Sequence, residues 1–235
     1  MGTLINVAAI IAATMIGLVL KKGLSEKIQK AVIFAIGLGL FAVSIGWFVA
    51  DFIVIEQQEV STRFDMLMII SLVLGIIIGA YFNLDDKINN FAFKVETKYH
   101  LPPVAKGFVT ATLIFGVGAM SITGAIQDGV GDGMNILLVK STLDFFTGII
   151  LTSTLGVGVG FSAIFVLVYQ GSITLLASVI SQYVSSDMIT SVSMVGNIIL
   201  IAIALNFMEI KKIKIANLIP ALLIPVIYFI ILSFI

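Results

Sequence analysis

Long uninterrupted apolar segments are the feature of this sequence that most restricts its fold. A helix needs about 20 mostly apolar residues to cross the hydrocarbon core of a bilayer. Segments of this kind lie near residues 2–20, 31–50, 65–82, 106–126, 134–153, 159–182, 189–206 and 213–234. We therefore predict an all-α, polytopic integral membrane protein with eight spans, forming a single transmembrane domain over residues 1–235. A seven-span alternative would merge the fifth and sixth segments, because only the uncharged, glycine-rich residues 154–160 separate them.

The composition agrees with a membrane protein and argues against other classes. Hydrophobic residues make up 60% of the 235 residues and charged residues 11%, whereas soluble domains contain about 25% charged residues. With no cysteine and one histidine, His100, thiolate nucleophiles and Cys/His zinc sites are not available. The net charge of zero argues against a nucleic-acid partner. We expect the lipid bilayer as partner, no cofactor, no bound metal and no removable signal peptide.

The basic residues predict how the chain is oriented in the membrane. In the eight-span order, lysines gather in the first, third and seventh loops: Lys21, Lys22, Lys27, Lys30, Lys87, Lys94, Lys98, Lys106, Lys211, Lys212 and Lys214. The loops of the opposite side hold one basic residue, Arg63. Because Lys and Arg are enriched in cytoplasmic loops, we expect the lysine-rich loops in the cytoplasm and both termini outside. The long third loop is typical of an amphipathic helix on the inner leaflet or of a solvated connector.

The two ends of the chain show a similar pattern. Asn6 precedes Lys21 by nearly the interval that separates Asn197 from Lys211, and in both cases a lysine pair leads into another apolar segment. Internal repeats are usual in transporter folds. We therefore interpret the first two and the last two segments as related hairpins, with a resemblance by composition alone as the alternative.

A polar stretch between residues 124 and 144 interrupts the apolar pattern. Lys140 and Asp144 are the one acid–base pair inside a predicted span, and their spacing places them on one face of a helix. A charge in hydrocarbon costs at least about 2.5–3.5 kcal/mol, so intramembrane charges are usually paired, face the protein interior and mark functional sites. We predict that this pair forms the centre of a site; the alternative is a structural staple between helices.

Glycines just before this pair predict a broken helix at residues 124–133, because each glycine costs about 1 kcal/mol relative to alanine in a helix. Unwound backbone at membrane depth persists only where it is buried in protein or lines a wet cavity. There, Gln127 and Asp128 would bind a cation or a polar solute. The alternative is an ordinary outer loop, and for Asp132 we favour this interpretation, with its side chain capping the next helix.

Three amides complete the candidate site: Asn6, Gln170 and Asn197 lie within predicted spans. Such side chains commonly form interhelical hydrogen bonds worth about 1 kcal/mol, so a packing role is the alternative for each. Gln170 stands beside Gly171 in the middle of the sixth segment, which predicts a second broken helix at residues 170–171.

Four runs, MGTLINVAAI (1–10), FGVGAMSITGAIQDG (115–129), LLVKSTLDFFT (137–147) and VYQGSITLLA (168–177), resemble the bacterial YdfK/YqgA-like membrane proteins, domain of unknown function 554. The likeness covers essentially the whole chain. It implies a bacterial inner-membrane protein with a shared site at the Gln-Asp-Gly and Lys-Ser-x-x-Asp motifs, and it implies no particular activity. Family members often have Asp-Gly at the second motif, whereas Phe145 follows Asp144 here, which leaves less room beside the carboxylate.

These features favour a small transporter or channel for an ion or a small polar solute, not an enzyme. In a proton-coupled form, protonation of Asp144 would release Lys140. One alternative is a scaffold or sensor that does not transport. A remote alternative, an intramembrane aspartyl protease, rests on a GxGD pattern ending at Asp132 and on the PAL sequence at residues 220–222, but the partner Tyr-Asp motif is missing. We also expect a homodimer.

Overall fold

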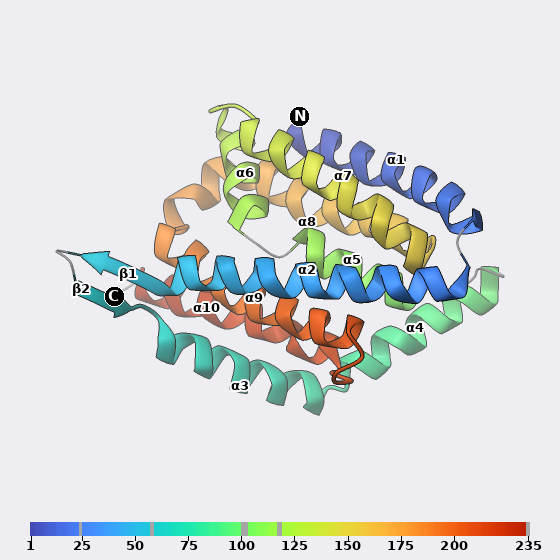
Figure 1. The fold of residues 1–235 in the computed structure, drawn as a ribbon. Helices are drawn as coiled ribbons and strands as arrows, with labels where there is room; N and C mark the ends of the chain where they lie inside the picture. Colours follow the sequence, from blue (N-terminus) through green and yellow to red (C-terminus); the bar gives the residue numbers. More distant parts are fainter. Residues whose placement is uncertain (24, 57–58, 100–102, 117–118, 234–235) are drawn as a thin grey trace. The chain divides into compact units, whose positions relative to one another are not determined.

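The computed structural model describes residues 1–235 apart from 24, 57–58, 100–102, 117–118 and 234–235. Its elements are α1 (Gly2–Gly23), α2 (Glu26–Phe52), β1 (Ile53–Glu56), β2 (Glu59–Thr62), α3 (Asp65–Tyr81), α4 (Leu84–Tyr99), α5 (Ala105–Gly116), α6 (Ala119–Val130), α7 (Asn135–Leu155), α8 (Gly158–Ile180), η1 (Ser181–Tyr183), α9 (Ser186–Phe207), η2 (Ile215–Leu222) and α10 (Leu223–Leu232). The prediction of an all-α fold is confirmed (Figure 1).

Among the described residues, six helices are long and apolar enough to cross a membrane, and up to eight spans result if each of two bent helix pairs counts as one. The bent pairs are α3 with the start of α4, at 50°, and α5 with α6, at 62°. The merger of the fifth and sixth segments is not observed, because α7 ends at Leu155 and α8 begins at Gly158. Gly156 between them has a φ of 81°, a left-handed value that glycine adopts without strain.

The contacts divide the chain into two compact units. The first unit comprises Met1–Phe34 and Ile88–Gln182, and the second comprises Ala35–Lys87 and Tyr183–Ile235. Each unit therefore combines segments that are distant in the sequence. The single domain and the paired hairpins expected from the sequence stay predictions.

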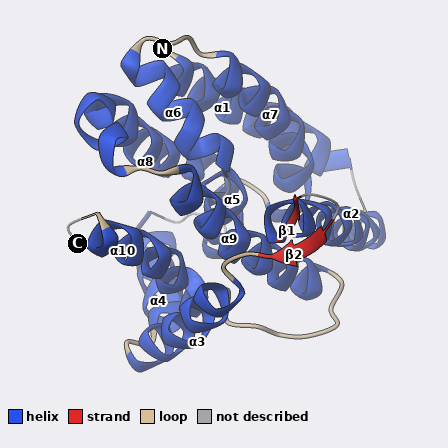
Figure 2. Cartoon of the chain, turned by 90° about the vertical axis from the view of Figure 1, so that its left-hand side faces the viewer, coloured by secondary structure: helices blue, strands red, loops and turns tan. Residues whose placement is uncertain are grey.

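Within the first unit, α1 and α7 run parallel and in register. A methyl group placed on Gly2 would lie 2.7 Å from Leu137 Cδ1, and one placed on Gly17 would lie 2.6 Å from Thr152 Cβ. Small residues on α1 thus let the two helices approach closely, as is usual between membrane helices. Figures 1 and 2 both show the two helices side by side.

The bent pair of α5 and α6 follows α8 along its length. Gly107 at the start of α5 packs against Val159, and Gly129 near the end of α6 lies so close to α8 that an added methyl group would come within 2.2 Å of the Thr174 carbonyl oxygen. A re-entrant loop would instead return to the end where it started. The pair is therefore one broken span, and it runs in the direction of α8.

The break predicted at residues 124–133 is present, although it begins after Gln127 and Asp128, whereas the break predicted at residues 170–171 is not observed. The helix α6 continues through Gln127 and Asp128, and the chain unwinds after Val130, where Gly131 and Gly133 have φ values of 88° and 105°. Helix α8 continues through Gln170 and Gly171 without a break. Tight packing between helices offsets the modest cost of glycine in a helix. Gly129 therefore remains helical, and its missing side chain allows α6 to approach α8 closely.

In the second unit, α3 packs against η2 through two glycines. A methyl group on Gly75 would lie 2.4 Å from Ala221 Cα, and one on Gly79 would lie 2.0 Å from the Asn217 carbonyl oxygen. The predicted last span begins as the 3-10 helix η2, which contains Pro220, a residue without an N–H for a helical hydrogen bond. The small antiparallel hairpin of β1 and β2 was not expected from the sequence (Figure 2).

Candidate polar site in the first unit

Lys140 and Asp144 form a buried ion pair on α7, with Lys140 Nζ donating to Asp144 Oδ2. This confirms the predicted contact. Their side chains are 6% and 9% exposed. A single helix turn positions both groups, so the pair depends on α7 alone for its geometry. Removing either partner would leave an unpaired charge in a buried setting, which is strongly unfavourable.

Asn6 connects this pair to two further helices. Its fully buried side chain donates from Nδ2 to Gln170 Oε1 on α8 at 3.2 Å and also interacts with the Asp144 carboxylate on α7. Asn6 thus joins α1, α7 and α8 at one point.

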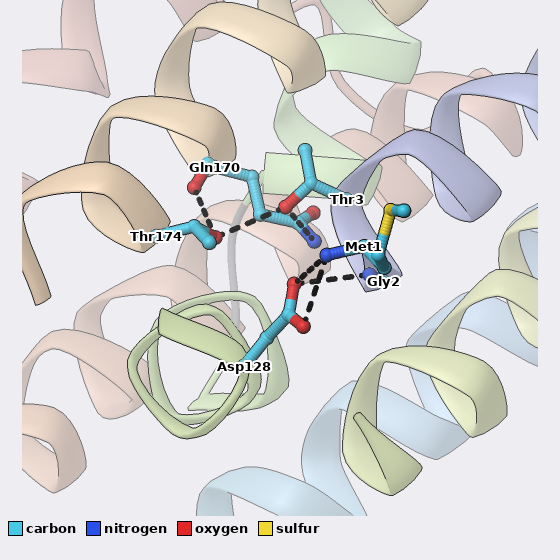
Figure 3. Close-up of polar contacts among 6 residues, drawn as sticks. All are labelled: Met1, Gly2, Thr3, Asp128, Gln170 and Thr174. Atoms are coloured by element: carbon cyan, nitrogen blue, oxygen red, sulfur yellow. Dashed lines mark hydrogen bonds and ion pairs between the residues drawn. The ribbon is translucent and has the colours of Figure 1, made fainter. Parts of the chain in front are cut away.

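Further hydrogen bonds continue from Gln170 toward the start of α1. Gln170 Nε2 donates to Thr3 Oγ1 at 3.3 Å, and the hydroxyls of Thr3 and Thr174 lie 3.1 Å apart (Figure 3). Thr174 also donates to the Gln170 carbonyl oxygen at 3.1 Å. We call this connected set the polar chain; it consists of Thr174, Thr3, Gln170, Asn6, Asp144 and Lys140.

Asp128 holds the beginning of α1. The ammonium group of Met1 lies 3.1 and 2.8 Å from the two carboxylate oxygens, and the Gly2 N–H donates to one of them at 2.9 Å. Figure 3 shows the carboxylate directed at this end of α1. A negative charge is favourable there because the start of a helix carries a partial positive charge. The sequence predicts that Asp128 binds a cation, and an ammonium group of the chain itself lies against it.

Four buried side-chain oxygens of this unit have no hydrogen-bond partner among the described residues: Asn6 Oδ1, Thr112 Oγ1, Gln127 Oε1 and Thr152 Oγ1. An unsatisfied buried polar atom costs about 1–3 kcal/mol, so nearly all such atoms in proteins bind a protein group, water or a ligand. These oxygens can therefore receive an N–H or O–H from a water molecule or a solute.

Asn197 belongs to a different cluster, in the second unit. Its Nδ2 donates to Asp51 Oδ2 at 3.2 Å, and Ser193 Oγ donates to the same oxygen at 2.6 Å. Sequence reasoning missed Asp51, because the predicted span ends at residue 50 whereas α2 continues to Phe52. It also missed Thr3 and Thr174, whose hydroxyls look like ordinary helix-packing groups in the sequence.

The partners of Asp144 indicate the chemistry that the site can perform. Among the described residues, no three His, Cys, Asp or Glu side chains come together as metal ligands. The Asp144 carboxylate accepts a hydrogen bond from the Lys140 ammonium and interacts with the Asn6 amide. Such donors stabilise an anion and repel a metal cation. A proton, in contrast, binds directly to the carboxylate and removes the attraction that holds Lys140.

A family model described as "Protein of unknown function (DUF554)" matches residues 1–230. The chain belongs to this family. It is 34% identical over 234 residues to "Uncharacterized membrane protein YdfK" of Bacillus subtilis (strain 168), an alignment that covers 99% of this chain and 97% of the relative. It is 27% identical over 229 residues to "Uncharacterized protein YqgA" of Escherichia coli (strain K12), covering 94% and 93%. No solved structure matches the chain. The resemblance seen in the sequence is confirmed, and this DUF554 protein is a membrane protein.

Proposed function

We propose that this DUF554 protein transports an ion or a small polar solute across the bacterial cytoplasmic membrane. One observation carries the proposal: a buried Lys140–Asp144 pair continues through Asn6 into hydrogen bonds that link three helices. Ionisable groups at membrane depth are costly and commonly mark ion pathways or proton relays. The broken span of α5 and α6 supports the proposal, because discontinuous helices are typical of transporter binding sites.

The ion pair suggests how transport is coupled. Protonation of Asp144 removes its negative charge, frees Lys140 and allows the helices around Asn6 to rearrange. The lysine-rich loops would face the cytoplasm and both termini the outside, in keeping with the enrichment of basic residues in cytoplasmic loops. We propose a homodimer as the assembly.

The second candidate is a scaffold or sensor that does not transport. It is favoured by the fact that Lys140 and Asp144 satisfy each other within a single helix, as a purely structural pair would. A protease function has less support, because Asp132 lies exposed in the turn between α6 and α7 and not within a helix. We therefore do not propose an enzyme.

Flux measurements in liposomes test the proposal. The purified protein is reconstituted, pH and ion gradients are imposed, and wild type is compared with Asp144→Asn at matched insertion. The matched control is Asp132→Asn, the same chemical change at an exposed turn position of the same unit. We expect protein-dependent flux that Asp144→Asn abolishes and Asp132→Asn preserves. An absence of flux across a broad panel of ions and metabolites would favour the scaffold or sensor.

A further inference from the structure

The uncharged members of the polar chain, Thr174, Thr3, Gln170 and Asn6, lie on one side of the ion pair. Leu137 of α7 packs against Gly2 at the start of α1, and Asp144 lies two helix turns further along α7. At 1.5 Å per residue, this places Asp144 about 10 Å deeper in the unit. The hydroxyl of Thr3 and the amides of Gln170 and Asn6 connect these two levels.

An apolar layer closes the opposite side. Gly148 follows Asp144 by one turn on the same face of α7. A methyl group on Gly148 would lie 2.9 Å from Ala13 Cβ and 3.7 Å from Phe115 Cζ, so at the level of Gly148 this face is filled by apolar side chains. The side chains of this layer are all fully buried: Ile10, Ala13, Phe115 and Leu151. They offer no hydrogen bond to a water molecule or an ion.

The charges around Asp144 favour a proton as its ligand. The charged partner of Asp144 is Lys140 on α7, whereas α1 and α8 contribute the neutral amides of Asn6 and Gln170 to the same site. The titratable residue of α8 beside Gln170 is Tyr169, whose ring stacks on Phe165. On α6, Asp128 is bound to the Met1 ammonium. A metal cation would have to displace both the ammonium and the amide from the carboxylate, whereas a proton binds without displacing either first.

We propose that Asp144 exchanges protons with the Met1 side of the membrane through the polar chain, and that the apolar layer blocks exchange with the other side. Side-chain amides do not titrate near neutral pH, so they orient water molecules instead of carrying the proton. Asn6 Oδ1 accepts a hydrogen bond from the last water. A hydronium ion then gives one proton to the carboxylate, an O–H bond forms on Asp144, neutral water remains, and Lys140 keeps its own proton. The inference rests on the proposed function, because the proton is its coupling ion or cargo.

The test is the rate at which a hydrophobic carbodiimide modifies Asp144, since this reagent reacts with protonated buried carboxyl groups. Right-side-out and inside-out vesicles hold different pH values on their two faces, and Asp144→Asn provides the blank. We expect the rate to rise as pH falls on the Met1 side and to ignore pH on the other side. The inference would be overturned if the modification rate depended on the pH of the other side, on the pH of both sides, or on neither. Protection by sodium at constant pH would also overturn it, because it would show a metal-cation site.

Two isosteric variants on α1 form a matched pair. Thr3 and Thr14 are 5% and 7% exposed and lie on the same face of α1, on opposite sides of the level of Asp144. The Thr3 hydroxyl belongs to the polar chain, whereas the Thr14 hydroxyl donates to the Ile10 carbonyl oxygen of its own helix. We expect Thr3→Val to lose the response to Met1-side pH and Thr14→Val to keep it; equal effects would overturn the route.

The outcomes separate this inference from the proposed function. A pH response on the Met1 side with no flux in liposomes would support the proton route and refute transport. Flux with an Asp144 modification rate that ignores pH would support transport and refute the proton route. If Thr3→Val does not insert, Thr174→Val removes the neighbouring hydroxyl from α8 and tests the same step.

Discussion

The Lys140–Asp144 pair allows its structural and functional roles to be separated by a double-mutant cycle. Both side chains are almost completely buried. In Lys140→Met, the aliphatic length is kept and the Asp144 carboxylate retains its interaction with the Asn6 amide. Breaking a buried pair by removing one partner costs about 3–5 kcal/mol, whereas replacing both charges by apolar groups is often neutral or stabilising. We therefore expect each single variant to be destabilised by this amount and Lys140→Met/Asp144→Leu to lie within about 1 kcal/mol of wild type.

The free energy of unfolding is measured in mixed detergent micelles at several pH values. Lower pH should restore stability in Lys140→Met, because a protonated Asp144 carries no charge that needs a partner. Single variants that each lose less than about 0.5 kcal/mol, or a double variant that loses the sum of the two, would refute the reasoning about an isolated buried pair. A stable double variant that still shows flux would assign the pair to structure alone.

Two further predictions concern packing and charge outside the site. Gly129→Ala should destabilise the protein by about 1–3 kcal/mol, because the new methyl group would collide with the Thr174 carbonyl oxygen. Gly39→Ala on α2, where no atom lies within 4 Å of the added methyl group, should be neutral or slightly stabilising. The midpoints of unfolding of the two variants are compared. The hydrogen bonds from Lys214 to Asp86, together with the Asp86 charge, raise the pKa of Lys214, so Asp86→Asn should lower that pKa in an NMR titration of the lysine side chain. Because the pKa is raised on folding, the pair favours the folded state below the ordinary lysine pKa of about 10.4, and this contribution is lost as pH rises through the raised value.

The helices were predictable because apolar length determines what can cross a bilayer, and the contact between Lys140 and Asp144 was predictable because it is local to one helix turn. The break at residues 124–133 was placed a few residues too early and the break at 170–171 was wrong, for a physical reason. A glycine weakens an isolated helix, but Gly129 is placed where α6 and α8 approach each other, and its lack of a side chain serves that contact. The sequence alone does not show which of these two effects decides.

The partners of Asn6 could not be predicted from local sequence. Asn6 and Gln170 are 164 residues apart, and their contact depends on the antiparallel packing of α1 and α8. The composition of α1 and α8 does not show that Asn6 contacts Gln170 and not Asn197, because all three are amides within predicted apolar spans. Long-range contacts of this kind are specified by the complementary surfaces of several helices together, of which a single helix sequence shows only one side.

Asp51, which is half-buried, and Asp144, which is buried, differ in a way that favours Asp144 as the proton-sensitive group. Asp51 lies in the last turn of α2, near the end of its span, where charged groups reach the aqueous interface at modest cost. Its carboxylate is held by the neutral donors Ser193 and Asn197, while Arg63 donates to its main-chain carbonyl oxygen. Asp144 lies near the middle of α7, and its partner is a full positive charge. Protonating Asp144 therefore changes the charge balance at membrane depth and leaves Lys140 unpaired, so that a second event, rearrangement or loss of that proton, has to follow. Asp51 forms no comparable side-chain ion pair with any residue that the structure describes, so its protonation creates no such requirement.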